Sequence, residues 1–253
     1  MALLKVDNIS KRFGGVQAVS SFSMEMEKGD IVAIIGPNGA GKTTIFNLIS
    51  KVCAPDSGSI FLDNVDITHM SQECVAREGI GRTFQNIRLF STLNILENVK
   101  VACDYKAKCS MAEAIFKLPR SFSSEKAITE EAMKCLKTVG MADLAMERPA
   151  NLPYGLQRRL EIARALAMHP KVLLLDEPAA GLNPEECLQL VDFLKKMIVK
   201  FNTSLIIIEH RMDVVMNMCQ KIYVQDFGKN IAMGTPQEIQ NDPVVLKAYL
   251  GEE

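Results

Sequence analysis

The sequence predicts an α/β fold in which helices cover both faces of a parallel β-sheet. Three short apolar runs are rich in Val, Ile and Leu and lack polar alternation, which is typical of strands covered on both faces. These runs are IVAIIG at 31–36, VLLLD at 172–176 and SLIIIEH at 204–210. Plausible helices follow them at 42–50, 184–200 and 211–218. A strand followed by a helix, repeated along the chain, indicates parallel strands with helical crossovers.

Three other regions have different patterns. The N-terminal stretches LLKVDNIS, FSMEMEKGD and SIFLDN alternate better, which predicts a small antiparallel sheet. Residues 93–168 contain no strong strand run and predict a helical insert, in which 125–141 has one apolar helix face and 104–124 reads as a helix and a surface loop. The C-terminal tail predicts short strands with turns at Gly228 and Gly234, then two small helices. We therefore expect a core of residues 1–92 and 169–253 and a helical subdomain of residues 93–168.

Composition narrows the class of protein. The 253 residues have a net charge of −1, so no bulk positive charge points to a nucleic acid partner. The seven Cys residues form no CxxC pair and indicate reduced thiols, and three His residues leave few ligands for zinc. The N-terminus does not resemble a signal peptide, and the longest aliphatic runs have strand length. We expect a soluble chain that is held at a membrane, if at all, by another protein.

The most specific functional motif in the sequence is GPNGAGKTT at 36–44. It fits GxxxxGK[ST], follows a buried strand and opens a helix, which predicts a nucleotide-binding P-loop NTPase core. Its backbone N–H groups and the helix N-terminus suit phosphate, Lys42 suits the β- and γ-phosphates, and the Thr43 hydroxyl suits Mg²⁺. The predicted cofactor-binding residues in this loop are Gly36, Pro37, Asn38, Gly39, Ala40, Gly41, Lys42, Thr43 and Thr44.

Two other strand ends carry candidate catalytic groups. In VLLLDEP at 172–178, Asp176 is a candidate for Mg²⁺ binding and Glu177 for orienting or deprotonating the attacking water. Taken alone, they are also compatible with a pair of solvated acids. His210 ends the third buried run, where ligands gather in open α/β sheets, although a lone histidine is usually a satisfied side chain. Gln85 in GRTFQN indicates nothing by itself.

The first half of the segment NLPYGLQRRLEIARAL, at 151–166, is compatible with two interpretations, whereas its second half predicts a helix. Leu156, Leu160 and Ala163 mark one helix face, and Arg158 and Glu161 are expected to fall largely elsewhere. Pro153, Tyr154 and Gly155 stand where this helix should begin. The segment is compatible with a phosphate-binding helix start and with a surface helix that simply begins at a proline.

The order of the phosphate loop, Gln85, LPYGLQRR, VLLLDEP and His210 resembles an ABC transporter nucleotide-binding subunit over nearly all of the chain. The resemblance implies that Phe13 stacks on adenine and that Gln85 reaches Mg²⁺ or water and reports to the membrane subunits. It also implies that His210 is the switch histidine and that AAGLNP at 179–184 is the D-loop, with Asn183 in place of the commoner Asp.

The resemblance further implies a cycle in which two subunits sandwich two ATP molecules head to tail. Each phosphate loop then meets an LSGGQ-type motif of the other subunit, which in this chain is Leu152, Pro153, Tyr154, Gly155, Leu156 and Gln157. The implied partners are integral membrane permease subunits, a second ATP-binding subunit in a homo- or heterodimer and, indirectly, a periplasmic or extracellular binding protein. ATP and Mg²⁺ are the implied cofactors, and the implied location is the cytoplasmic face of the plasma membrane.

Within the family, several stretches look most like ATPases of branched-chain amino-acid importers. These stretches include GRTFQNIRLFSTLNILENV, the long 103–124 segment, IIIEHRMDVVM and the ending KAYLGEE. A lipopolysaccharide-export ATPase and a urea or amide importer ATPase remain alternatives. An ABC ATPase of DNA repair or translation would carry long coiled coils or two fused ATPase halves. A non-hydrolysing regulatory subunit would not need Glu177.

Pro153 departs from the family pattern, because common members have Ser at this position. The change removes one hydroxyl donor to the γ-phosphate of the opposed ATP, and proline is tolerated in a first helical turn. In a heterodimer the missing donor predicts that the two ATP sites differ, with the site that this helix serves being slower. The alternative is that Pro153 is a neutral change within a helix start.

Overall fold

The computed structural model describes residues 2–104 and 119–250. The chain divides into two compact units, Met1–Gln85 with Lys171–Glu253, and Asn86–Pro170. The second unit thus begins before residue 93 and ends after residue 168, the limits expected for the helical subdomain. No helix in the described ranges is both long enough and apolar enough to cross a membrane.

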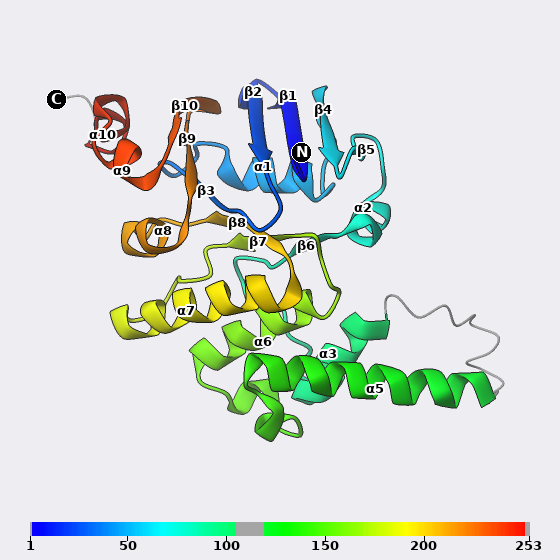
Figure 1. Cartoon of the computed structure of the whole chain (residues 1–253). Helices are drawn as coiled ribbons and strands as arrows, with labels where there is room; N and C mark the ends of the chain where they lie inside the picture. The colour runs from blue at the N-terminus through cyan, green and yellow to red at the C-terminus, as the bar shows by residue number, and fades with distance from the viewer. Residues whose placement is uncertain (1, 105–118, 251–253) are drawn as a thin grey trace. The chain divides into compact units, whose positions relative to one another are not determined.

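The first unit contains the expected parallel sheet, which confirms the α/β prediction (Figure 1). Its strand order is β10-β9-β3-β8-β7-β6. The strands are β3 (Ile31–Ile35), β6 (Ile80–Arg82), β7 (Val172–Asp176), β8 (Ser204–Ile208), β9 (Lys221–Asp226) and β10 (Lys229–Gly234). The three predicted strands β3, β8 and β7 are direct parallel neighbours, and every residue in them is buried. Only β10, at one edge, pairs antiparallel.

A second, antiparallel sheet has the order β2-β1-β4-β5, which confirms the expectation for the N-terminal part. It consists of β1 (Leu4–Phe13), β2 (Val16–Met26), β4 (Ser57–Leu62) and β5 (Val65–Asp66). Helix α1 (Lys42–Ile49) lies between the two sheets (Figure 1). One apolar core joins all three layers, since Ile9, Phe22, Phe46 and Ile206 belong to the same buried cluster. Burial of this kind stabilises by about 25 cal/mol per Å² of apolar surface.

All of the remaining helices of the first unit except α2 were expected from the sequence. Helix α7 covers the sheet face opposite α1 and buries Leu190, Leu194 and Met197 (Figure 1). The predicted 184–200 and 211–218 segments correspond to α7 and α8. The helices are α2 (Gln72–Glu78), α7 (Pro184–Phe201), α8 (Met212–Met218), α9 (Pro236–Gln240) and α10 (Pro243–Leu250).

The described residues of the second unit form helices, 3-10 turns and connecting loops, with no strand among them. It contains α3 (Ile95–Asp104), α5 (Pro119–Val139), short 3-10 turns at Ala142–Leu144 and Pro149–Asn151, and α6 (Tyr154–Leu166). The three α-helices pack on one another around buried residues such as Val99, Leu136 and Leu160. Of the segment 104–124, expected as a helix and a loop, residues 105–118 lie outside the described residues.

Helix α6 is buried on more sides than its apolar face predicts. At 3.6 residues per turn, Arg158 and Glu161 lie on the other side of the helix from Leu160 and Ala163, as expected, but their side chains are also buried, at 1% and 4% exposure. They form an ion pair in which Arg158 Nη1 donates to Glu161 Oε2 at 2.8 Å. Burial of the two charges is tolerated because they are three residues apart and neutralise each other.

Candidate nucleotide-binding site

The loop of residues 36–41 joins β3 to α1, and at two of its positions only glycine fits. Gly36 has φ +148° and Gly41 has φ +100°, which L side chains rarely adopt. A Cβ on Gly41 would overlap the carbonyl oxygen of Ala18 in β2, and one on Gly36 would overlap the carbonyl oxygen of Gln225 in β9. These glycines therefore let the loop lie directly on the backbone of two strands.

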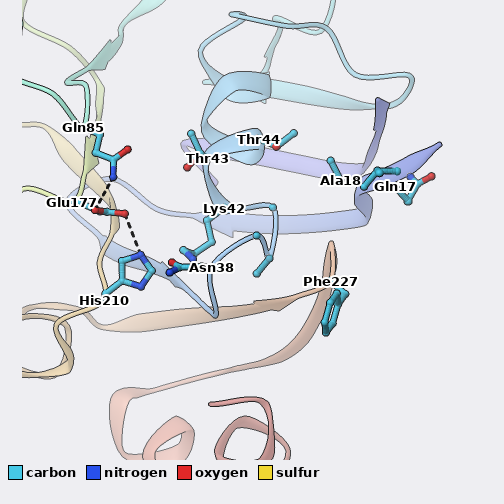
Figure 2. A pocket seen from close by; sticks show the side chains of 14 residues that line it. Gln17, Ala18, Asn38, Lys42, Thr43, Thr44, Gln85, Glu177, His210 and Phe227 are labelled. Atoms are coloured by element: carbon cyan, nitrogen blue, oxygen red, sulfur yellow. Dashed lines mark hydrogen bonds and ion pairs between the residues drawn. The ribbon is translucent and has the colours of Figure 1, made fainter. Parts of the chain in front are cut away.

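This loop forms one wall of a cavity of about 410 Å³ (Figure 2). The cavity brings together the ends of β2, β7 and β8, the loop after β6, and the β9–β10 turn. Its lining residues are Val16, Gln17, Ala18, Asn38, Gly39, Ala40, Gly41, Lys42, Thr43, Thr44, Gln85, Glu177, His210 and Phe227. Most of the predicted loop residues and all three predicted catalytic residues thus line a single cavity, and Gly36 and Pro37 are not among its lining residues.

Lys42 is almost fully buried, at 6% exposure. Its Nζ donates to the carbonyl oxygens of Gly36 at 2.7 Å and Pro37 at 2.8 Å, so the ammonium is held inside the loop. Burial lowers the pKa of Lys42, and the nearby charges of Glu177 and Asp176 oppose that shift. The arrangement places a positive charge beside the cavity, where an anionic phosphate gains a charge-assisted hydrogen bond.

Glu177 is held between two nitrogen groups (Figure 2). Gln85 Nε2 donates to Glu177 Oε2 at 3.0 Å, and His210 Nε2 lies 3.1 Å from Glu177 Oε1. The backbone of Glu177 has φ +48°, an uncommon conformation for a residue other than glycine. A carboxylate held in this way beside a phosphate-binding loop is able to orient water or accept its proton.

Asp176 is 3% exposed and is not one of the cavity-lining residues. Arg82 Nη2 donates to its Oδ2 at 3.3 Å, and Arg82 Nη1 donates to Asn47 Oδ1 and Ser50 Oγ. The Arg82 guanidinium also lies over the ring of Phe84 at 5.4 Å. Arg82 was not predicted as a site residue, although it lies within the same GRTFQN stretch as Gln85.

The predicted metal ligands fit Mg²⁺ by their chemistry, because a hydroxyl, an amide and a carboxylate all offer the oxygen donors that this ion prefers. Thr43 and Gln85 line the cavity, and the charge of Asp176 acts on Lys42 there. No group of three or more His, Cys, Asp and Glu residues suited to a metal occurs within residues 2–104 and 119–250. A Mg²⁺ ion would therefore complete its shell with phosphate oxygens and water.

Two exposed aromatic residues lie at or near the ends of strands that border the cavity. Phe13, proposed to stack on adenine, is 49% exposed at the end of β1 and is not a lining residue, although its strand partner Val16 is. Phe227, which we did not single out, does line the cavity and is 85% exposed. Its turn is anchored to the phosphate loop, since Gly228 N donates to Ala40 O at 3.0 Å. A single aromatic residue in a turn has no sequence pattern that would have predicted the place of Phe227 at the cavity.

In the second unit, the LPYGLQ motif forms the start of α6. Pro153 is the N-cap, one residue before the first helical residue, and it offers no side-chain cap. Its carbonyl accepts from Leu156 N and Gln157 N, and Gln157 Nε2 folds back to Leu152 O at 2.8 Å. Gly155 and the half-exposed Tyr154 lie in the first turn. The N-cap position of this helix therefore carries no side-chain hydroxyl.

Comparison with known proteins agrees with this geometry. The family described as "ABC transporter" matches residues 19–180, and "Branched-chain amino acid ATP-binding cassette transporter" matches residues 229–253. The high-affinity branched-chain amino acid transport ATP-binding protein LivG of Salmonella typhimurium is 41% identical over 250 residues, covering 99% of this chain and 98% of the relative. The corresponding BraF protein of Pseudomonas aeruginosa is 41% identical with the same coverage.

Solved structures agree at the level of fold and nucleotide binding. An ATP-binding cassette of an ABC transporter in an ADP conformation superposes with a TM-score of 0.86 at 32% identity, covering 100% of both chains. A dimeric cassette bound to ADP and Pi superposes with a TM-score of 0.76 at 25% identity, covering 92% of this chain and 98% of that one. The chain therefore belongs to the ABC transporter family, in which it is an ATP-hydrolysing, nucleotide-binding subunit.

Proposed function

We propose that this chain hydrolyses Mg–ATP to drive the import of branched-chain amino acids through membrane permease subunits, at the cytoplasmic face of the membrane. The observation that carries the substrate class is the 41% identity to the LivG and BraF relatives over essentially their whole length. The match of residues 229–253 to a branched-chain amino acid transporter family supports the same class. These findings favour it over the lipopolysaccharide-export and urea or amide alternatives.

The proposed catalytic roles follow from the cavity. Lys42, Asn38, Gly39 and the neighbouring loop residues hold the phosphates, and Phe13 stacks on the base. Glu177 orients the attacking water and takes its proton, and its contacts with Gln85 and His210 keep the carboxylate at the cavity edge. Mg²⁺, bound by Thr43 and Gln85 and through water by Asp176, would neutralise charge on the phosphates. Gln85 also reports to the permease subunits.

The proposed working form contains two ATP-binding subunits, this chain with a copy of itself or with a related chain. The LPYGLQ motif of one subunit then faces the ATP of the other. Because Pro153 has no side-chain hydroxyl, the ATP that it faces loses one hydrogen bond of about 1–2 kcal/mol relative to a serine at this position. In a heterodimer this makes the two sites unequal.

The test is reconstitution of the chain with its co-expressed permease and ATPase partners in liposomes, with the substrate-binding protein added. We expect ATP-dependent uptake of leucine, isoleucine or valine, and no uptake of urea. Glu177→Gln should lower ATP hydrolysis by about 10²–10⁴-fold while ATP binding is retained. Glu185→Gln, an exposed acid in the first turn of α7, is the matched control and should hydrolyse ATP normally. Urea uptake without leucine uptake would refute the substrate class, and full activity of Glu177→Gln would refute its catalytic role.

A further inference from the structure

The segments that follow β7 and β8 lie side by side at the same edge of the sheet. The two strands are parallel neighbours, with Asp176 opposite Ile208. Beyond them, Glu177 N donates to Ile208 O at 2.9 Å, so the backbone of the proposed catalytic acid is bonded to the strand that leads to His210. The relative position of these two segments thus determines how the Glu177 and His210 side chains meet.

Glu209 connects the two segments from within the protein interior. Its side chain is 2% exposed, and its Oε1 accepts from Ala179 N at 2.7 Å, across to the segment after Glu177. Its Oε2 accepts from His210 N at 3.1 Å and Arg211 N at 3.4 Å, within its own segment. The Glu209 carboxylate therefore accepts hydrogen bonds from the backbone of both segments. Because a buried carboxylate is costly without such hydrogen bonds, the position of the side chain and the positions of these backbone N–H groups constrain each other.

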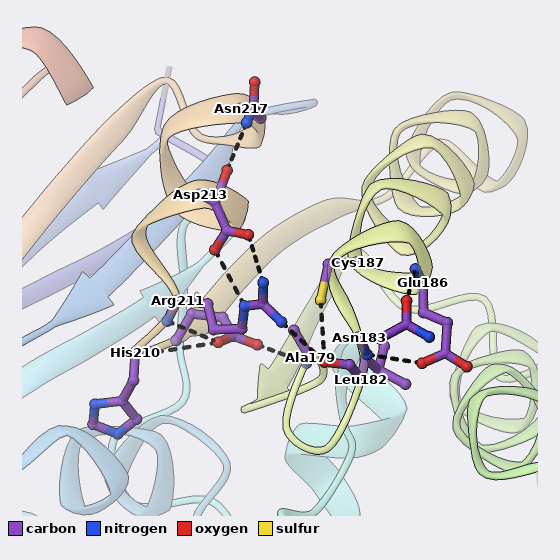
Figure 3. A network of polar contacts seen from close by, with 10 residues as sticks. Ala179, Leu182, Asn183, Glu186, Cys187, His210, Arg211, Asp213 and Asn217 are labelled. Carbon is purple, nitrogen blue, oxygen red and sulfur yellow. Dashed lines mark hydrogen bonds and ion pairs between the residues drawn. The ribbon is translucent and has the colours of Figure 1, made fainter.

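Arg211 makes a second connection farther along the same segments (Figure 3). Its Nη1 donates to Leu182 O at 2.9 Å, and its Nε and Nη2 hold both oxygens of Asp213 at 3.2 and 2.7 Å. Asn183 then caps α7 through a reciprocal pair of hydrogen bonds with Glu186. The segment 177–183 is thus held near its start by Glu209 and at its end by Arg211 and the helix cap.

From this geometry we infer that Glu209, assisted by Arg211, is a positioning residue that sets the Glu177–His210 pair for hydrolysis. Glu209 is not a lining residue of the cavity, so it acts through the backbone of its neighbours. The Glu177 carboxylate is useful as a base only within a fraction of an ångström of its working position, and the two connections supply that restraint. The inference rests on the proposed catalytic role of Glu177.

The test compares steady-state ATP hydrolysis and ATP affinity in the reconstituted complex. In Glu209→Gln one oxygen still accepts from Ala179 N, but an amide NH₂ then faces the His210 and Arg211 donors. We expect kcat to fall about tenfold while KM and ATP affinity stay within about twofold. Glu238→Gln is the matched control, because Glu238 also accepts a backbone N–H, from Thr235, in a helix cap that contributes nothing to the cavity.

A double-mutant cycle separates positioning from general structural support. If Glu209 acts through Glu177, adding Glu209→Gln to Glu177→Gln should lower the residual rate by less than about twofold, whereas independent effects would multiply. Arg211→Lys keeps the surface charge but loses the Leu182 contact, and it should lower kcat about threefold without changing ATP affinity. This second variant keeps the inference testable if Glu209→Gln does not fold.

The outcomes distinguish this inference from the proposed function. No hydrolysis by the wild-type complex would overturn the proposed function and the inference together. Normal wild-type hydrolysis with an unchanged kcat in a folded Glu209→Gln variant would overturn the inference alone, as would multiplicative effects in the cycle or an unchanged kcat in Arg211→Lys. A loss confined to KM would also overturn it, because positioning of the catalytic pair acts on the chemical step.

Discussion

Replacing Gly41 by alanine should damage the phosphate loop through strand β2 rather than through the nucleotide. At φ +100° an L residue is strained by about 1–2 kcal/mol, and the new methyl group would overlap the Ala18 carbonyl oxygen. Because non-bonded heavy atoms settle at about 3.5–4.0 Å, the loop has to move on the order of 1 Å. Overpacking of this kind adds about 1–3 kcal/mol. The expected loss in the free energy of unfolding is therefore about 2–5 kcal/mol.

The same displacement should weaken nucleotide binding, since Lys42 and Thr43 follow directly. A shift of about 1 Å is compatible with a loss of about 10²-fold. Gly140→Ala is the matched control, because Gly140 also has a positive φ, +74°, but has open space around a built Cβ. It should cost only about 1–2 kcal/mol and leave ATP affinity unchanged. Urea unfolding and titration with a fluorescent ATP analogue measure both effects. Equal destabilisation by the two variants, with normal ATP affinity in Gly41→Ala, would refute the reasoning.

Three further predictions concern other parts of the chain. Pro153→Ser should speed ATP turnover at the site that this helix faces, whereas Pro153→Ala, which adds no hydroxyl, should not; equal single-turnover rates would contradict a role for the hydroxyl. Burial raises the pKa of Glu209 above its ordinary 4.5, so its contribution to stability is largest below pH 4.5 and falls as pH rises through the folded-state value. The difference in unfolding free energy between the wild type and Glu209→Gln should therefore shrink from pH 4.5 toward neutrality, and a pH-independent difference would argue against this. Burial also raises the pKa of Cys103 to about 11 and of Cys135 and Cys219 to about 12, so mass spectrometry should show slower alkylation of these thiols than of exposed Cys74 at pH 8, with the contrast lost in urea.

Local patterns were sufficient for the main architecture. The apolar runs within 31–35, 172–176 and 204–208 became the adjacent parallel strands β3, β7 and β8, because strands buried on both faces are mostly apolar without alternation. The phosphate loop was equally visible, since its glycines, Lys42 and Thr43 are consecutive in the chain. Periodicity could not show that the Arg158–Glu161 pair of α6 is buried, because two charged residues in the sequence look exposed until they pair with each other.

By itself, the sequence determined the strand–helix order, the phosphate loop and the identity of the candidate catalytic residues. Only the tertiary structure decided which groups these residues meet. Glu177 contacts Gln85 and His210, 92 and 33 positions away, and Glu209 reaches Ala179 from the neighbouring strand end. Such contacts depend on the lateral order of the strands, which has no signature in local composition. Strand and loop chemistry is local and therefore readable, whereas the pairing of buried polar groups exists only after distant segments have packed together.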